Sequence, residues 1–496
     1  MAVHQPSGTS STAVIEQQIP LQDVSHFLTN PHDAKPAVSH NTISSSPRVS
    51  DTKGTPEADP IEILPSPTTH TAEKPERWNA PRTNLYRTGA AFWSFVVMGS
   101  NDAAYGALIP YLQSHYSLSF LIISLIFLSP LVGYTASALL NNIIHMRFGQ
   151  RGVAIGASSC HLTAYIVIAL HPPYPVLVVI FMLAGFGNGL ADAAWNAWMG
   201  NMANPNEVLG FLHACYGVGA VLAPLVATTM ITKGGLGWWC FYYVMIAMAT
   251  LELLTSTLAF HSATGAAFRA KNPRSSHSKD TRMKQALLHL PHARTTWLCA
   301  LFLLGYVGVE VALGGWIVKF MLTERHGGRF ASGMTATGFW MGVTAGRVVL
   351  GFVTPRVGER LAIAVLPPAP FPSHPHSMLT KTEIYLPLTL ALELIFWLIP
   401  SFLVSAIAVS LQGFFLGPLF PAAIVAATKL LPRELHVSAI GFAAAFGGSG
   451  AAIFPFAVGA IAQARGVRVL QPVVLGLLGG IWGLWLGLPR FRAKVE

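Results

Sequence analysis

Charged side chains are scarce in this sequence of 496 residues: Asp, Glu, Lys and Arg together make up only 10% of it. A soluble globular domain carries roughly 25% charged residues, so this chain cannot cover a water-exposed surface of its size. The alternating polar and apolar runs of a membrane β-barrel are also missing. Instead, continuous apolar runs of about twenty residues recur, which is the length of a helix that crosses a bilayer. The sequence therefore predicts an all-α membrane protein.

Cysteine is rare as well, with four residues that all fall in apolar segments. This excludes a disulfide framework and matches no metal-site spacing, so we expect no metal and no cofactor. The net charge of +10 would suggest a nucleic-acid partner in a soluble protein. Here the basic residues lie in short loops between apolar runs, so we expect a lipid bilayer and no nucleic acid as partner. Without a nucleotide-binding loop or a nucleophile constellation, the chain is not expected to be an enzyme.

The chain divides into a polar start and a long apolar remainder. Residues 1–83 are rich in Ser, Thr and Pro and predict a disordered cytoplasmic tail. Twelve apolar spans follow, at about 88–113, 118–143, 150–170, 175–200, 207–232, 238–260, 296–322, 332–354, 384–400, 402–428, 436–462 and 470–489. The basic segment 261–295 separates six spans from six. We therefore expect an N-terminal six-helix bundle over 84–260, a cytoplasmic linker over 261–295 and a C-terminal bundle over 296–490.

Lys and Arg predict the orientation, because cytoplasmic loops are enriched in them. They gather in alternate loops, including the linker, and this pattern places both termini in the cytoplasm. A multi-pass protein of the plasma membrane or the vacuolar membrane is expected.

The two halves of the chain repeat each other. Asp102-x-Ala-x-Gly106 in the first span matches Glu310-x-Ala-x-Gly314 in the seventh. The pattern Gly-Phe-x-x-Ala-x-x-Gly-x-Gly-Ala-x-x-x-Pro occurs at 210–224 and again at 441–455. Because six spans separate the copies, the repeat is parallel, about an axis along the membrane normal. The second copy also carries a Pro-rich insertion at about 366–383, either a genuine loop extension or an artefact of gene prediction.

Twelve spans, a six-plus-six repeat, a basic central loop and an Arg-x-Gly-x-Arg loop after spans 2 and 8 resemble the major facilitator superfamily. The wording of residues 101–110 and 184–189 is similar to fungal members near the fucose-permease-like branch, including the bypass-of-stop-codon type. The resemblance implies the major facilitator fold: two six-helix bundles with pseudo-two-fold symmetry, and spans 1, 4, 7 and 10 around a central cavity. It also implies a gating role for the loop residues Arg147, Gly149, Arg151, Arg356, Gly358 and Arg360.

Several polar residues lie inside the predicted spans, where a charge costs about 2.5–3.5 kcal/mol and is usually functional. Asn188, Asp192 and Asn196 follow one helix face at i, i+4 and i+8. The expected binding residues for solute and proton are Asn101, Asp102, Tyr105, Asn188, Asp192, Trp195, Asn196 and Glu310. Interhelical hydrogen bonding is the competing interpretation of these groups. The resemblance places the spans of Glu252 and Glu393 at the periphery, where packing against a polar neighbour is expected.

Carboxylates, amides and aromatic rings suit a small polar organic solute, for example a sugar. A carboxyl group in a low-dielectric medium also loads and releases a proton nearer neutral pH. The sequence thus predicts a secondary active transporter, a symporter that works by alternating access with proton coupling. The alternatives are a non-transporting nutrient sensor on the same fold and an exporter of a fungal metabolite.

Overall fold

The computed structural model describes residues 76–271, 284–290, 292–350, 378–432 and 435–489. Most of the predicted tail and the middle of the predicted linker lie outside the described residues. So do the second loop motif, with Arg356, Gly358 and Arg360, and residues 366–377 of the predicted insertion.

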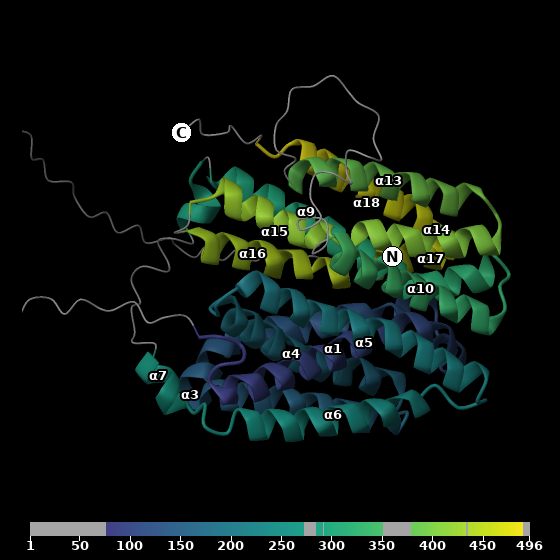
Figure 1. Cartoon of the computed structure of the whole chain (residues 1–496). Helices are drawn as coiled ribbons and strands as arrows, with labels where there is room; N and C mark the ends of the chain where they lie inside the picture. The colour runs from purple at the N-terminus through teal and green to yellow at the C-terminus, as the bar shows by residue number, and fades with distance from the viewer. Residues whose placement is uncertain (1–75, 272–283, 291, 351–377, 433–434, 490–496) are drawn as a thin grey trace, which may run out of the picture. The chain divides into compact units, whose positions relative to one another are not determined.

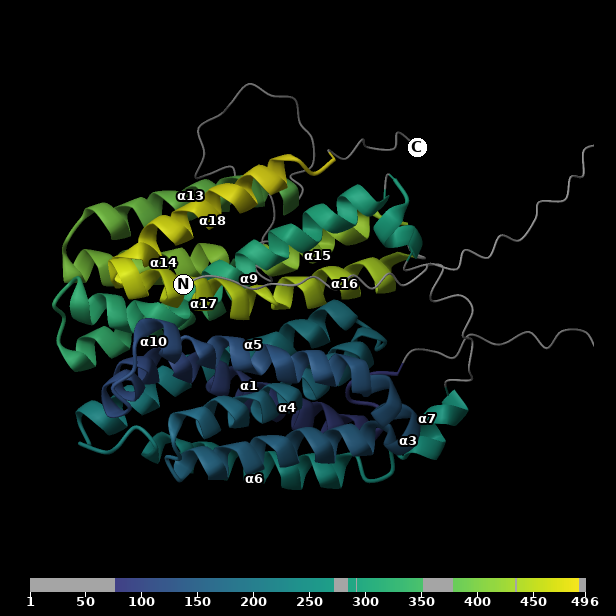
Figure 2. The ribbon, with the colours of Figure 1, turned by 180° about the vertical axis from the view of Figure 1, so that it is seen from behind.

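The first half of the chain forms long helices that run alongside one another (Figures 1 and 2). They are α1 (Arg82–His115), the short α2 (Phe120–Ile123), α3 (Leu125–Ala169), α4 (Tyr174–Gly200), α5 (Pro205–Thr232) and α6 (Cys240–Ala259). Local sequence sets several helix starts. Ser119 caps α2 by accepting a hydrogen bond from the Ile122 backbone N–H, and α5 begins at Pro205, whose missing N–H is not needed at that position.

Helix α3 passes through two predicted spans and breaks between them at Gly149. This residue has a φ of 72°, in the left-handed region that favours glycine. The short helix α7 (Gly265–Lys271) packs against α3 beside this break. The Arg151 backbone N–H donates to the Ala263 carbonyl at 3.0 Å, and a side chain at Gly149 would overlap Thr264. The predicted loop between spans 2 and 3 is therefore a tight turn held by the start of the linker.

The second half is also helical. It contains α9 (His292–Thr323), α10 (Arg329–Val348), α13 (Met378–Leu398), α14 (Phe402–Leu416), α15 (Leu419–Leu430), α16 (His436–Gly448), α17 (Gly450–Arg465), the 3₁₀ turn η3 (Val467–Val469) and α18 (Leu470–Leu486). Predicted span 10 is divided into α14 and α15 next to Pro418, and span 11 into α16 and α17 at Ser449. Helix α13 begins at Met378, inside the region predicted as the insertion.

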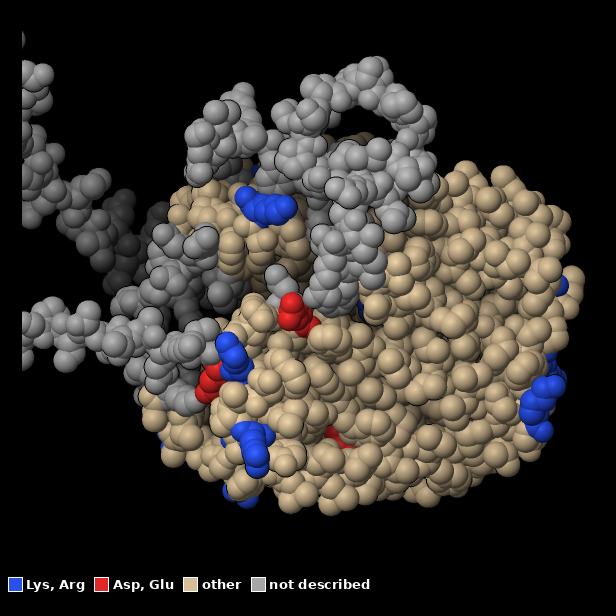
Figure 3. Space-filling view, in the orientation of Figure 1, with Lys and Arg blue, Asp and Glu red and all other residues tan. Residues whose placement is uncertain are grey.

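Among the described residues, eight helical stretches are long and apolar enough to cross a membrane. One of them, 120–169, contains two of the predicted spans. Helices α1 and α10 are not among the eight, and in α1 polar residues such as Asn101 and Asp102 interrupt the apolar run. Helix α13 has a shorter apolar stretch. Figure 3 shows how the charges are distributed on one face of the molecule. Charged side chains lie toward the helix ends, with a broad uncharged region between them.

The duplicated sequence pattern has a duplicated packing. Gly219 on α5 lies so close to the Val96 carbonyl of α1 that a side chain would not fit. Its repeat equivalent, Gly450 on α17, stands in the same relation to the Leu304 carbonyl of α9. Small residues allow such close backbone approach between membrane helices. The same helix pair is thus built twice, once in each half.

The first helices of the two halves also meet at equivalent glycines. Gly106 on α1 faces the backbone carbonyl of Gly314 on α9, and α1 packs against α9. These two glycines occupy the same position in the two sequence copies. Contact between equivalent residues is what a pseudo-two-fold axis between two halves requires.

Candidate functional site

The Asp102 carboxylate is the centre of a hydrogen-bonded cluster near the middle of α1. Its Oδ1 accepts from Asn101 Nδ2 and from Asn188 Nδ2 on α4, both at 3.0 Å, and its Oδ2 accepts from the Tyr216 hydroxyl on α5 at 3.0 Å. Asn101 Nδ2 also donates to the Tyr105 hydroxyl at 2.9 Å. The structure thus brings together four residues predicted from the sequence and adds Tyr216, which the sequence analysis missed.

A second polar cluster follows one turn along α4. Asp192 Oδ1 accepts from Asn196 Nδ2 at 2.8 Å, and Asn196 Oδ1 lies 3.1 Å from His213 Nε2 on α5. The Asp192 and Asp102 carboxylates are close enough to interact electrostatically. Asp102 therefore accepts hydrogen bonds from three side chains, whereas Asp192 accepts from one, on its own helix.

Trp195 does not join these clusters. Its ring is buried and stacks on Phe260, which follows α6, with ring centroids 4.5 Å apart and planes at 23°. It also packs edge-on against Trp198. Trp195, which was predicted as a binding residue, is thus part of the packing between α4 and the end of α6.

Glu310 on α9 forms an ion pair with a residue that the sequence analysis missed. Its Oε1 lies 2.6 Å from Arg347 Nη2 on α10, and Arg347 also donates to the Tyr306 hydroxyl at 3.3 Å. The side chains of Glu310 and Arg347 are 7% and 17% exposed, so the pair is largely removed from water. The signal in the sequence was an arginine inside the predicted span 332–354.

The two halves meet at these clusters. Helix α5 packs against α10, where Gly217 faces the Thr344 side chain. Tyr216, which donates to Asp102, is close enough to interact electrostatically with Glu310. Tyr216 is therefore hydrogen-bonded to Asp102 and lies near Glu310, the equivalent acid of the second repeat.

Five polar side chains of these clusters are only partly buried: Asp102, Asp192, Tyr216, His213 and Arg347. All of them except Asp192 form a hydrogen bond or an ion pair with a residue on another helix. Charges inside a membrane usually face a polar partner or a cavity, and each charge here has a polar partner.

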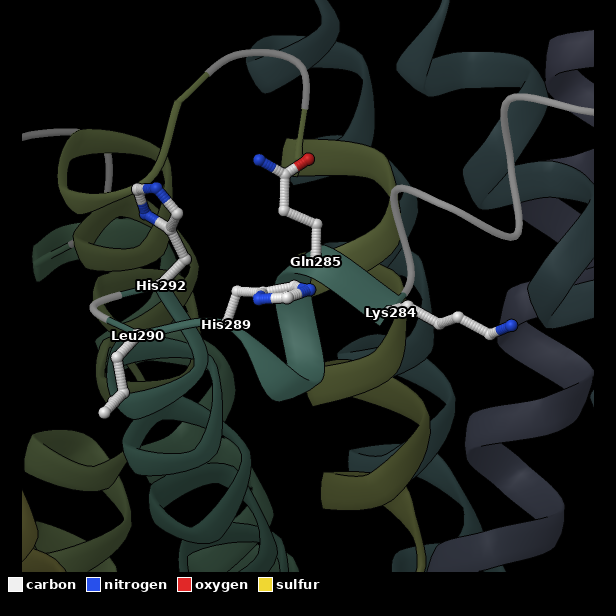
Figure 4. A pocket seen from close by; sticks show the side chains of 5 residues that line it. All are labelled: Lys284, Gln285, His289, Leu290 and His292. Carbon is white, nitrogen blue, oxygen red and sulfur yellow. The ribbon is translucent and has the colours of Figure 1, made fainter. Parts of the chain in front are cut away.

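A separate surface pocket lies before α9 and does not involve these clusters. Figure 4 shows its lining side chains, Lys284, Gln285, His289, Leu290 and His292. They belong to the end of the basic linker and the start of α9. Across the described residues, no group of three or more His, Cys, Asp or Glu side chains is placed to hold a metal ion.

The family model of the Major Facilitator Superfamily matches residues 91–370. The chain belongs to this superfamily. It accordingly has the major facilitator fold, with twelve transmembrane helices in two six-helix bundles, as predicted. The twelve are represented by the described helices when α3 counts twice and the pairs α14/α15 and α16/α17 count once each.

Two curated relatives agree with this assignment. The chain is 28% identical over 417 residues to Bypass of stop codon protein 6 of Saccharomyces cerevisiae, covering 80% of this chain and 81% of that protein. It is 21% identical over 273 residues to the glucose/mannose transporter of Bacillus subtilis, covering 55% of this chain and 66% of the relative. The resemblance to the bypass-of-stop-codon type is thereby confirmed.

Solved structures show the same fold. The E. coli fucose:proton symporter superposes with a TM-score of 0.55 at 14% identity, covering 83% of this chain and 99% of that one. A D-xylose-proton symporter superposes with a TM-score of 0.65 at 13% identity and the same coverage. Its membership of the Major Facilitator Superfamily makes the chain an integral multi-pass membrane protein of a transporter family.

The superfamily loop motif after span 2 is the turn at Gly149. The Arg147 guanidinium lies over the Phe148 ring at 5.4 Å, and Arg269 on α7 donates to the Met146 carbonyl. The backbone of Arg151 is bonded to the linker as well. These contacts connect the loop to the segment that follows α6.

The two peripheral carboxylates are fully buried and have polar partners. Glu252 on α6 accepts from Ser94 Oγ at 2.6 Å and lies 2.9 Å from His161 Nδ1. Glu393 on α13 accepts from Gln412 Nε2 at 2.9 Å. Both are packed against polar neighbours from other helices.

Proposed function

We propose that this chain is a secondary active transporter that moves a small polar organic solute, a sugar, together with protons by alternating access. The cluster around Asp102 supports the solute class. It offers a carboxylate, two amides and two tyrosine hydroxyls from α1, α4 and α5. Such groups can exchange their mutual hydrogen bonds for bonds to the hydroxyls of a sugar. The relatives and structural neighbours include proteins named as transporters of glucose or mannose, fucose and xylose.

Proton coupling rests on the pair of carboxylates on α1 and α4. Two carboxylates close enough to interact do not ionise independently, because the charge of one opposes ionisation of the other. Asp102 receives donors from Asn101, Asn188 and Tyr216, and these bonds stabilise its charged form. Asp192 has one donor, Asn196. Asp192 is therefore the better carrier of the coupling proton.

Alternating access requires a closure that can open, and contacts between the halves supply one. Trp316 on α9 packs beside Phe120 and Phe127, with centroids 6.0 Å apart in both pairs. The Leu121 backbone N–H donates to Gln463 Oε1 on α17 at 3.3 Å. With cytoplasmic termini, these contacts lie at the non-cytoplasmic end. We infer that they close the cavity on that side.

Uptake into lipid vesicles tests this proposal. Purified protein is reconstituted, a pH gradient is imposed, and radiolabelled glucose, mannose, fucose and xylose are offered separately. Concentrative uptake of at least one sugar is expected, and Asp192→Asn should abolish accumulation while leaving sugar exchange. Exchange needs binding and rocking of the halves but no proton release.

The matched control is Glu393→Gln, in the second half of the chain. It removes a buried carboxylate that is hydrogen-bonded to the Gln412 amide, and this variant should accumulate sugar normally. The proposal fails if none of the sugars enters, or if Asp192→Asn and Asp102→Asn both keep full pH-driven accumulation. Binding without uptake would favour a nutrient sensor. Transport only out of the compartment that holds the termini would favour an exporter.

A further inference from the structure

Behind the Asp102 cluster lies a buried group of titratable side chains that the proposed transport cycle does not use. His161 on α3 and Glu252 on α6 are joined at 2.9 Å, and both side chains are at most 1% exposed. Ser94 on α1 donates to the other oxygen of Glu252 at 2.6 Å. An ion pair so completely removed from water needs partners for every remaining polar atom.

The second nitrogen of the His161 ring faces α4. Gly187 lies against this edge of the ring, where a side chain would overlap Nε2, and the Asn188 side chain lies beside it. Neither His161 Nε2 nor Asn188 Oδ1 has a hydrogen-bond partner among the described residues, although both atoms are buried. Two unpartnered polar atoms on neighbouring side chains satisfy each other if one of them carries a proton.

The hydrogen-bond roles then follow from chemistry. The Glu252 carboxylate can only accept a hydrogen bond from His161 Nδ1, and the Asn188 oxygen can only accept one from His161 Nε2. Only an imidazolium, which carries a proton on both nitrogens, can donate to both. An amide with its oxygen toward His161 must present its NH₂ group to the other side. That group donates to Asp102 Oδ1 at 3.0 Å. A neutral His161 would instead favour the reversed amide, with its oxygen toward Asp102.

We propose that His161 and Glu252 are positioning residues that hold the Asn188 amide with its donor toward Asp102, and so keep Asp102 ionised. This inference rests on the proposed proton coupling, because it assigns the proton to Asp192 rather than Asp102. The other titratable groups that face the pair are Asp102 on α1 and Tyr165 on α3, and Tyr105 on α1 and Tyr242 on α6 lie next to Tyr165. Helix α4 contributes the neutral Asn188. The tyrosines are uncharged near neutral pH, so Glu252 and Asp102 are the charges that act on His161.

Infrared titration tests this positioning role without requiring transport. The full chain in lipid vesicles carries Asp192→Asn, which removes the band of that carboxyl group. The protonated-carboxyl band that disappears when Asp102→Asn is added is then the band of Asp102. Replacing the cation by His161→Gln should move the pH midpoint of that band upward by about one to two units, the worth of a hydrogen bond to a charged group. Glu252→Gln should move the pH midpoint in the same direction. This variant replaces His161→Gln in the test if His161→Gln does not fold.

Two further variants separate the amide's role from a direct effect of charge. In an Asn188→Leu background, which keeps the volume but removes the amide, His161→Gln should cause no further shift. Glu393→Gln should leave the midpoint unchanged. The positioning role is overturned if neither His161→Gln nor Glu252→Gln moves the midpoint, or if the shift persists in full without Asn188. A shift as expected in a protein that transports none of the sugars would contradict only the proposed function. Normal pH-driven uptake with no shift would contradict only the positioning role.

Discussion

Removing the carboxylate of Glu310 should destabilise the protein strongly, because it leaves Arg347 charged and unpaired. The two side chains are 2.6 Å apart and only 7% and 17% exposed, which places them with buried rather than surface ion pairs. Deleting one partner of a buried pair costs about 3–5 kcal/mol. The Tyr306 hydroxyl, 3.3 Å from Arg347, still accepts a hydrogen bond from Arg347 in the variant and offsets a small part of this cost. We therefore expect Glu310→Gln to lower the free energy of unfolding by about 3 kcal/mol, measured by reversible unfolding in mixed micelles.

The control and a double variant make the magnitude decisive. Glu324→Gln removes a partly exposed acid next to Arg325 just beyond the end of α9. It should change stability by only about 0–1 kcal/mol, because water screens its charge. Glu310→Gln combined with Arg347→Gln should recover most of the loss, because no uncompensated charge remains. A loss below about 1 kcal/mol in Glu310→Gln, equal to that of the control, would refute the burial of this pair.

Three further predictions concern a glycine contact between helices, the turn at Gly149 and the Pro-rich segment. Gly106→Ala should destabilise by about 1–3 kcal/mol because the new methyl group meets the Gly314 carbonyl, whereas Gly89→Ala, with open space around it, should be neutral or slightly stabilising in the same unfolding assay. Gly149→Ala should cost about 1–2 kcal/mol for its left-handed conformation, and Gly476→Ala on α18 nothing; equal effects would contradict the tight turn. Deleting residues 366–377, which spares α13, should preserve expression and sugar uptake, and loss of either would show that the Pro-rich segment is structural.

The apolar pattern was sufficient to predict the helices, because a lipid environment forces every span to satisfy its backbone internally. The break within α3 was foreseen as a loop from the Arg-x-Gly-x-Arg motif. The division of spans 10 and 11 into two helices each was not foreseen. Gly417 with Pro418, and Ser449, lie within apolar runs that carry no charge to mark a boundary.

The candidate site could be predicted only in part. Spacing on one helix identified Asn101 with Asp102 and Asn188 with Asp192. The partner on another helix depends on how each helix is rotated, and no local pattern encodes that rotation. For this reason Tyr216 and Arg347 were missed, and Trp195, which shares the sequence neighbourhood of Asp192, stacks on Phe260 instead.

The measurement that tests the central claim most directly is proton movement triggered by sugar. A weakly buffered suspension of vesicles containing the protein receives the sugar that it accumulates, and the external pH is recorded. Coupled uptake should make the medium more alkaline with the wild-type chain, and Asp192→Asn should abolish this signal while still exchanging the sugar. Sugar uptake without any change in external pH, or an unchanged signal in Asp192→Asn, would contradict the account.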